Sequence, residues 1–238
     1  IRGNRFVRNW RNSPIYLPYS GSDLEMVIRL FRGFVRLQYS EFVIDKLNTP
    51  IIEHLALIAT GNSEKNGLVL RGECGVGKTA TLKVWSKFRA TVLASSAMKL
   101  KLKQPLRFDD TNEYLPKITF MDPISLLSGF TKLGYEFFTE KMGDILILDD
   151  LGTTTSINYF GSQVNILEQL ILSRYAEFKQ NPNIEFYGTT NLTTDQLTEL
   201  IGQRSMSRLS EMTAWKEGLI LGNDRRKDNQ KLTVWPKI

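Results

Sequence analysis

The stretch Gly67-Leu-Val-Leu-Arg-Gly-Glu-Cys-Gly-Val-Gly-Lys-Thr79 decides the fold. It opens with a short apolar run, which predicts a buried strand over 67–72. Residues 72–79 then fit the pattern G-x-x-x-x-G-K-[ST], and a helix is predicted from Lys78 to about Ser95. A glycine loop of this pattern between a strand and a helix is a phosphate-binding loop. The stretch therefore predicts an α/β protein that binds a nucleotide.

The chemistry of this loop depends on its glycines and on the two residues at its end. The glycines allow a tight turn whose N–H groups face inward, so that the loop and the helix N-terminus form an anion nest. Lys78 is expected to reach the β- and γ-phosphates, and the Thr79 hydroxyl to complete the shell of Mg²⁺. A glycine-rich turn without a ligand is the alternative, and the positions of Lys78 and Thr79 disfavour it. The expected nucleotide contacts are Gly72, Glu73, Cys74, Gly75, Val76, Gly77, Lys78, Thr79 and Ala80.

A second motif, Ile145-Leu-Ile-Leu-Asp-Asp150, is an apolar strand that ends in two carboxylates. In open α/β sheets ligands bind at the carboxyl edge, where this strand would end. Asp149 is then expected to hold Mg²⁺, and Asp150 to accept a hydrogen bond from the attacking water. The alternative is an acidic turn at the surface, because Asp150-Leu-Gly152 is also good turn chemistry.

Three further polar residues are weaker candidates. Asn191 ends another predicted strand and could orient water beside Asp150, although spacing alone favours a helix cap or a turn. Arg204 and Arg208 lie four residues apart and so share one face of a predicted helix. They could reach a phosphate bound by a neighbouring subunit, or only a nearby acid.

Strand and helix patterns alternate along most of the chain, which predicts a parallel sheet covered by helices on both faces. A basic arm over 1–20 and a helical segment from Ser22 to about Thr60, with a second helix over 50–58, precede the glycine loop. A lysine-rich stretch over 99–117 reads as a surface insertion. The other predicted elements are strands over 118–121, 144–148, 184–189 and 218–222, and helices over 124–141, 162–179, 194–201 and 203–212.

Composition narrows the class of protein further. The 238 residues include 31 Lys+Arg and 25 Asp+Glu, a net charge of +6 that suits a polyanionic partner or merely a solvated basic face. The single cysteine forms no disulfide within the chain, which favours the cytoplasm. No apolar run approaches the length of about 20 residues that a membrane-spanning helix needs. With one histidine, neither a Ser/His/Asp triad nor a His/Cys metal site is expected.

In their order and spacing, these motifs resemble the DnaC/IstB group of AAA+ ATPases, which are bacterial helicase loaders and transposition helper ATPases. The resemblance runs from about residue 65 to 225. Besides the glycine loop, it is carried by Leu148-Asp-Asp-Leu-Gly152, Ser173-Arg-Tyr175, Thr189-Thr-Asn-Leu192, Gly202-Gln-Arg204 and Ser207-Arg-Leu209. It implies that Asn191 is the sensor I residue and that Arg208 is an arginine finger acting in trans. Glu73, Cys74 and the long first crossover depart from the pattern of the group.

The resemblance implies an AAA+ ATPase domain over 61–238, preceded by the arm and helical segment of 1–60. It further implies slow hydrolysis of ATP with Mg²⁺, a homo-oligomer in the ATP-bound state, and action on DNA in replication or in transposition. Single-stranded DNA is the expected substrate, with Lys132, Tyr135 and Lys141 as contacts, and a replicative helicase or a transposase is the expected partner. A nucleotide-switched adaptor with negligible turnover and, less favoured, a P-loop kinase remain alternatives.

Overall fold

The computed structural model describes the chain in seven segments, 21–39, 41–46, 48–90, 117–140, 142–153, 156–181 and 184–216. The predicted arm over 1–20, nearly all of the insertion over 99–117 and the predicted strand over 218–222 lie outside these residues. Within them, no helix is both long enough and apolar enough to span a membrane.

A five-stranded parallel sheet forms the centre of the molecule, with strand order β2-β3-β6-β1-β7. The strands are β1 (Gly67–Arg71), β2 (Ile118–Met121), β3 (Ile145–Leu148), β6 (Glu185–Thr190) and β7 (Ala214–Lys216). Every residue of β3 and β6 is buried, because these strands lie inside the sheet with helices on both faces. The fold is therefore the predicted α/β architecture, with a glycine loop between its first strand and the helix that follows.

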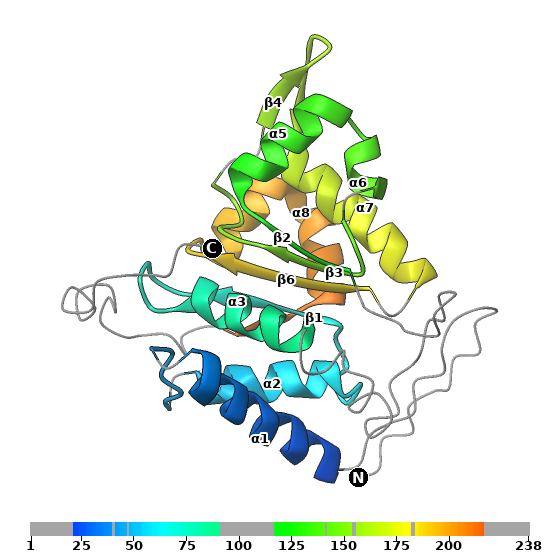
Figure 1. Ribbon diagram of the computed structural model, residues 1–238. Helices are drawn as coiled ribbons and strands as arrows, with labels where there is room; N and C mark the ends of the chain where they lie inside the picture. The colour runs from blue at the N-terminus through cyan, green and yellow to red at the C-terminus, as the bar shows by residue number, and fades with distance from the viewer. Residues whose placement is uncertain are drawn as a thin grey trace.

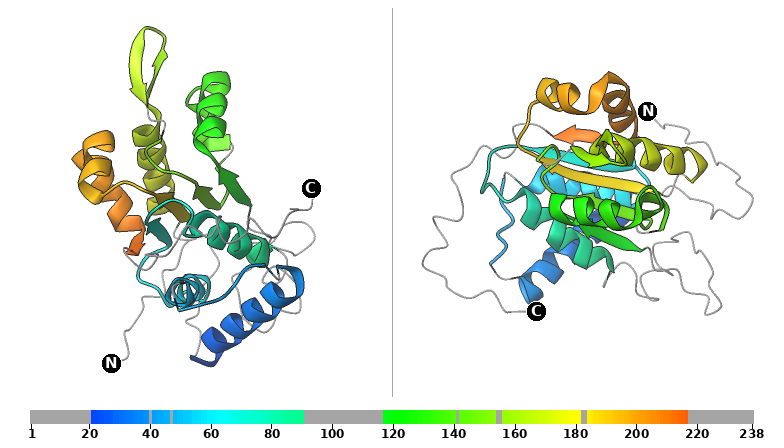
Figure 2. Two further views of the ribbon diagram at one scale, coloured as in Figure 1. Left: turned by 90° about the vertical axis from the view of Figure 1, so that its left-hand side faces the viewer. Right: turned by 90° about the horizontal axis from the view of Figure 1, so that it is seen from above.

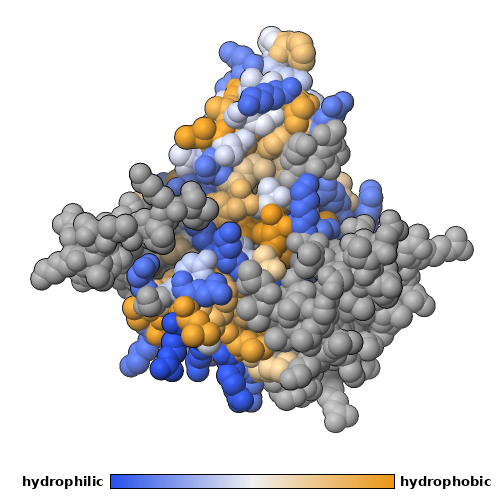
Figure 3. All heavy atoms as spheres, viewed as in Figure 1, coloured by the Kyte–Doolittle hydropathy of each residue, from blue (hydrophilic) through white to orange (hydrophobic). Residues whose placement is uncertain are grey.

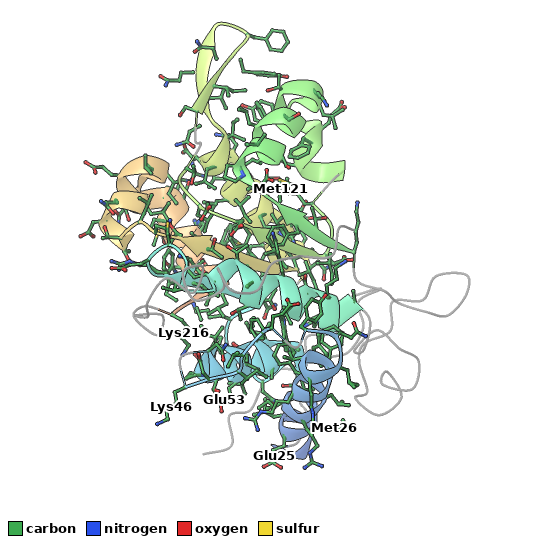
Figure 4. All side chains as sticks on the ribbon, turned by 60° about the vertical axis from the view of Figure 1, so that its left-hand side comes forward. Glu25, Met26, Lys46, Glu53, Met121 and Lys216 are labelled. Carbon is green, nitrogen blue, oxygen red and sulfur yellow. The ribbon has the colours of Figure 1, made fainter. Side chains whose placement is uncertain are left out.

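Helices form a layer on each face of the sheet (Figure 1). One layer contains α1 (Gly21–Gln38), α2 (Thr49–Ala59) and α3 (Lys78–Phe88). The other contains α5 (Pro123–Leu133), α6 (Glu136–Glu140), α7 (Ile166–Gln180) and α8 (Thr194–Met212). Each layer encloses its own cluster of buried apolar side chains against the sheet. Figure 4 shows Met121 of β2 in the interior, where it belongs to the cluster under the second layer, whereas Glu25, Lys46 and Glu53 are exposed on the side of the first layer.

One face of α1 is apolar and packs against the buried cluster of the first layer. Val27 and Phe31 are fully buried, and the Phe31 ring lies 5.4 Å from Trp85 and 5.2 Å from Phe88 of α3. The arginines of α1 lie on its exposed side, as an amphipathic surface helix requires. The helical segment before the glycine loop thus packs onto α3. The domain boundary between residues 60 and 61 remains a prediction.

Two predicted helices were wrong in their extent. The helix expected over 124–141 is broken into α5 and α6 at Gly134, whose φ of +59° suits glycine and where a side chain would collide with the Tyr159 hydroxyl. The helix expected from 162 begins only at Ile166, because Asn165 caps it by accepting a hydrogen bond from the Glu168 N–H. Residues 156–165 instead form an antiparallel hairpin of β4 (Ser156–Tyr159) and β5 (Ser162–Asn165), which projects from the second layer (Figure 2).

At the end of the described chain, the prediction of two helices over 194–201 and 203–212 was confirmed. The label α8 covers both, and Gly202 between them has a non-helical backbone, with a φ of +79° and a ψ of 153°. The short edge strand β7 at 214–216 follows directly and pairs with β1. The sequence analysis did not identify this strand.

Candidate functional site

Three neighbouring strands bring the predicted site residues together. β1 leads into the glycine loop of 72–79, β3 ends before Asp149, and β6 ends before Asn191. Because β3, β6 and β1 are adjacent and parallel, all three segments meet at the carboxyl edge of the sheet. Backbone hydrogen bonds join them there, from the Gly72 N–H to the Thr190 carbonyl (3.2 Å) and from the Leu151 N–H to the Thr189 carbonyl (2.7 Å).

The glycine loop turns at Gly75 and Gly77, which have φ values of +83° and +100°. This left-handed backbone is strained for a residue with a side chain, so the spacing of the two glycines sets the shape of the loop. Lys78 opens α3 directly after Gly77. The N-terminus of α3 therefore lies at the end of the loop, as an anion site requires.

Lys78 is buried, with 5% of its surface exposed, and its ammonium group has three hydrogen-bond acceptors. It donates to the carbonyl oxygens of Gly72 (2.6 Å) and Glu73 (2.8 Å) and to Oδ1 of Asn191 (2.7 Å). Lysine side chains are rarely buried, and this one is buried because the loop wraps around it. The hydrogen bond between Lys78 and Asn191 links the glycine loop after β1 to the end of β6.

Asp149 directly follows β3 and contacts Thr79 at the start of α3. Its Oδ1 accepts hydrogen bonds from the hydroxyls of Thr79 (2.7 Å) and Thr189 (2.6 Å). A threonine hydroxyl and a carboxylate at this separation are hard oxygen donors of the kind that Mg²⁺ prefers. Among the described residues there is no group of three or more His, Cys, Asp or Glu side chains that could hold a metal ion. The Thr79 hydroxyl and the Asp149 carboxylate could hold such a cation.

Asp150 has an unusual backbone for a residue other than glycine, with a φ of +48°. Aspartate tolerates this region better than most residues. Its N–H donates to the Thr189 hydroxyl (2.8 Å), while its side chain is exposed. The Thr189 hydroxyl therefore contacts both acidic residues: it donates its proton to the Asp149 carboxylate and accepts a hydrogen bond from the Asp150 N–H. The sequence analysis assigned Thr189 no role, although it lies two residues before Asn191 at the end of the same strand.

Asn191 bridges the glycine loop with both ends of its amide. Oδ1 accepts from Lys78, and Nδ2 donates to the Cys74 thiol sulfur at 3.1 Å. Asn191 does not cap the next helix, which was one of the two alternatives to a role in the site. Thr193 caps α8 instead, through a reciprocal pair of hydrogen bonds with Gln196. Asn191 is exposed and lies within hydrogen-bond distance of the lysine expected to meet the γ-phosphate.

The two candidate arginines differ in their surroundings. Arg204 is exposed and makes no ion pair or hydrogen bond within the part of the chain that the structure describes. The Arg208 guanidinium lies 4.6 Å from the Tyr175 ring, and its NH1 donates to the Tyr175 hydroxyl (3.1 Å) and to Glu211 (3.4 Å). Hydrogen bonds from Lys179 and Tyr175 also lower the pKa of Glu211. Arg208 is thus held on α7 and α8, with its described partners outside the glycine loop.

No family model matches this chain, and no curated protein matches it. Solved structures do resemble it. A crystal structure of a DNA replication initiation factor is 16% identical, with a TM-score of 0.51, and the alignment covers 82% of this chain and 54% of the other. Domain III of the Thermotoga maritima replication initiation protein DnaA is 17% identical, with a TM-score of 0.47 and coverages of 75% and 65%. AMPPCP-bound DnaA from Aquifex aeolicus is 14% identical, with a TM-score of 0.46 and coverages of 83% and 56%.

The chain spans 54–65% of the length of these three structures. The first likeness agrees with the features already described, a parallel five-stranded sheet with helices on both faces and a glycine loop between β1 and α3. The fold is that of an AAA+ P-loop NTPase.

Proposed function

We propose that this chain is an AAA+ ATPase that binds and slowly hydrolyses ATP and acts on DNA. One observation carries the proposal. The glycine loop, the end of β3 and the end of β6 are joined by side-chain hydrogen bonds, from Lys78 to Asn191 and from Thr79 and Thr189 to Asp149. Residues with the chemistry for phosphate binding, cation binding and water positioning therefore share one small region.

Each residue of this region has a role in the proposed hydrolysis. The loop N–H groups and the N-terminus of α3 bind the phosphates, and Lys78 exchanges its carbonyl acceptors for phosphate oxygens. Thr79 and Asp149 would hold Mg²⁺, which supplies positive charge against the phosphoryl oxygens when bound. Asp150 accepts a hydrogen bond from the attacking water, and Asn191 orients that water toward the γ-phosphate.

We further propose that Arg208 completes the site of a neighbouring copy. The resemblance to the DnaC/IstB group assigns this residue the arginine finger, which stabilises the charge that develops on the transferred phosphoryl group. The Arg208 side chain is 39% exposed, so it is accessible to a second subunit. The proposed active form is a homo-oligomer, assembled with ATP, in which hydrolysis is slow until the finger of the neighbour is in place.

Action on DNA is supported by the net charge of +6, by the fold shared with a DNA replication initiation factor, and by the motifs that resemble helicase loaders and transposition helpers. The proposed substrate is single-stranded DNA, and the proposed partner is a replicative helicase or a transposase. Lys132 and Tyr135 are exposed, as DNA contacts must be, and the predicted contact Lys141 lies outside the described residues.

An ATPase assay with and without single-stranded DNA tests this function against its alternatives. Stimulation by DNA is the result that we expect. Transfer of phosphate to a small acceptor would identify a P-loop kinase instead. Tight ATP binding with no turnover in either condition would identify a nucleotide-switched adaptor.

A further inference from the structure

The turn of the β4–β5 hairpin carries a phenylalanine where neither folding nor packing requires one. Phe160 and Gly161 are the two central residues of this turn, with φ values of +47° and +80°. Two-residue hairpin turns of this kind favour Asn, Asp or Gly at the first position, because a bulky side chain is strained there. Phe160 is also 92% exposed, so burial does not offset that strain.

The hairpin is fixed to the molecule at its base. Ile157, Tyr159 and Val164 pack against the apolar cluster of the second helix layer. Asn165, the last residue of β5, caps α7 and donates from Nδ2 to the Leu200 carbonyl at 2.6 Å. The base of the hairpin therefore packs on the second layer, while its turn projects from the molecule. Figure 3 shows hydrophobic atoms at this projecting end, at the top of the view.

Phe160 is one end of a row of aromatic rings, which we call the aromatic surface and define as Tyr135, Tyr159 and Phe160. The Tyr159 ring lies 4.6 Å from Phe160 and 6.2 Å from Tyr135, and its other neighbour is the buried ring of Phe130 at 5.0 Å. Tyr135 is 52% exposed. The buried Phe130 ring supports the row, and the residues at its two ends, Tyr135 and Phe160, are exposed.

The polar groups around the aromatic surface carry little charge. Residues 156–165 contain no charged side chain, and Asn158, Ser162 and Gln163 are exposed beside the turn. These side chains can donate and accept hydrogen bonds, so the hairpin does not present the continuous apolar face that a hydrophobic protein pocket would cover. Lys132 is exposed on α5, three residues before Tyr135, and supplies one positive charge, whereas the exposed Glu136 directly after Tyr135 supplies one negative charge.

We infer that the aromatic surface stacks the unpaired bases of a single-stranded nucleic acid. Every base offers a π-face for stacking, whereas the bases of a duplex already stack on one another. The amide and hydroxyl groups beside the turn suit base edges, and Lys132 suits a phosphate. This inference rests on the proposed action on DNA, and it names the residues that contact the bases.

The test compares Phe160→Ala with the wild type for binding to two fluorescent strands of equal length, oligo(dT) and an abasic strand. The abasic strand keeps its phosphates but has no base to stack. We expect Phe160→Ala to weaken binding of oligo(dT) by at least about fivefold and to leave binding of the abasic strand unchanged. Phe160→Trp should bind oligo(dT) at least as well as the wild type. Leu37→Ala is the matched control, because Leu37 is an exposed apolar residue (85%) on α1, far from the hairpin.

Two further variants separate stacking from other causes. Phe160→Asn places a residue that the turn prefers, so it should unfold at the same temperature as the wild type or higher, and yet lose binding of oligo(dT) as Phe160→Ala does. Phe160→Leu keeps apolar area without a π-face and should also bind weakly. Wild-type binding by the leucine variant would overturn stacking in favour of an apolar contact.

Other results overturn the inference in distinguishable ways. Equal binding of oligo(dT) by the wild type and Phe160→Ala would contradict the proposed role of the aromatic surface but not the proposed action on DNA. Absence of oligo(dT) binding by the wild type would contradict both the role of the aromatic surface and the proposed action on DNA. If Phe160→Ala changes the oligomeric state in light scattering and leaves DNA binding unchanged, the occupant of the surface is a second copy of this chain.

Discussion

At the scale of single residues, the candidate site shows how a loop sequence sets the position of a charge. The pattern of 72–79 predicts that Lys78 meets phosphates, but it does not show where the side chain lies. In the structure the ammonium group is enclosed by its own loop and by Asn191, because the carbonyls of Gly72 and Glu73 point toward it. Such contacts depend on the backbone path, which residue types alone do not specify.

Lys78→Ala should abolish ATP binding. The substitution removes the positive charge expected at the β- and γ-phosphates, while the Gly72 and Glu73 carbonyls that it frees belong to half-buried or exposed loop residues and can bind water. Isothermal titration calorimetry with ATP measures the loss, and circular dichroism during heating checks that the fold is kept. ATP affinity equal to that of the wild type would contradict the assignment of the loop.

Asp150→Asn should bind ATP normally and hydrolyse it at a strongly reduced rate, about 10² to 10⁴ times slower. Asparagine adopts the positive φ of this position as readily as aspartate, so the backbone should not change, but a neutral amide is a poor acceptor for the proton of the attacking water. Single-turnover kinetics measure the effect.

The matched control for Asp150→Asn is Asp149→Asn. Because Asp149 bonds Thr79 and Thr189, we expect this control to alter the Mg²⁺ dependence of ATP binding, which Asp150→Asn should leave unchanged. Turnover of Asp150→Asn equal to that of the wild type would remove Asp150 from the mechanism.

At the scale of elements, the long periodic patterns were the most predictable. The sequence analysis placed β2 correctly, placed α2, β1, β3 and β6 to within a few residues, and placed the start of α1 but not its end at Gln38. Continuous apolar runs and amphipathic stripes have few competing explanations. The hairpin was missed for a physical reason. Its turn has phenylalanine in place of Asn or Asp, and its strands alternate weakly, so residues 162–165 were assigned to the helix that follows.

Arg174 shows an element held in place by one side chain. The resemblance singled out Ser173-Arg-Tyr175 as a motif, and the structure gives its arginine structural contacts. The buried guanidinium donates to the carbonyls of Gly143 (2.7 Å), Asp144 (2.6 Å) and Glu185 (2.8 Å). It also pairs with Glu177 at 2.9 Å. Arg174 therefore ties α7 to the amino ends of β3 and β6, at the edge of the sheet opposite the glycine loop.

Arg174→Ala should lower the free energy of unfolding by about 3–5 kcal/mol, because it leaves a partly buried carboxylate and three carbonyls without their donor. Arg174→Lys should recover only part of this loss, since a single ammonium group cannot reproduce the planar set of donors. Urea denaturation measures both variants. The control is Arg29→Ala on the exposed face of α1, for which we expect a change within about 0.5 kcal/mol. A comparably small effect at Arg174 would contradict the assigned role.

At the scale of the whole molecule, the sheet explains why the candidate site could be predicted in part. Once β1, β3 and β6 are recognised as parallel neighbours, the glycine loop, Asp149, Asp150 and Asn191 must meet at one edge. The role of Thr189 needs the register of β6 against β3, and the partners of Arg208 need the packing of α7 on α8. Neither relation can be read from local spacing.

The oligomer gives the remaining prediction. Arg208 contacts Tyr175 and Glu211 within its own chain, and the resemblance to the DnaC/IstB group makes a phosphate bound by a neighbouring copy its proposed target. Arg208→Ala should bind ATP normally but hydrolyse it about 10³ times more slowly, or slower still. The specific activity of the wild type should rise with protein concentration, and that of the variant should not. Colorimetric phosphate release over a dilution series measures both.

Mixing two inactive variants tests whether the finger acts in trans. The Lys78→Ala protein lacks ATP binding but keeps Arg208, whereas the Arg208→Ala protein binds ATP but lacks the finger. In a mixed oligomer, a Lys78→Ala subunit can supply Arg208 to the ATP of its neighbour, so the mixture should recover part of the wild-type activity. If the mixture stays as inactive as its components when light scattering shows that they co-assemble, Arg208 does not act in trans. Arg204, exposed on the same helix, is then the next residue to substitute.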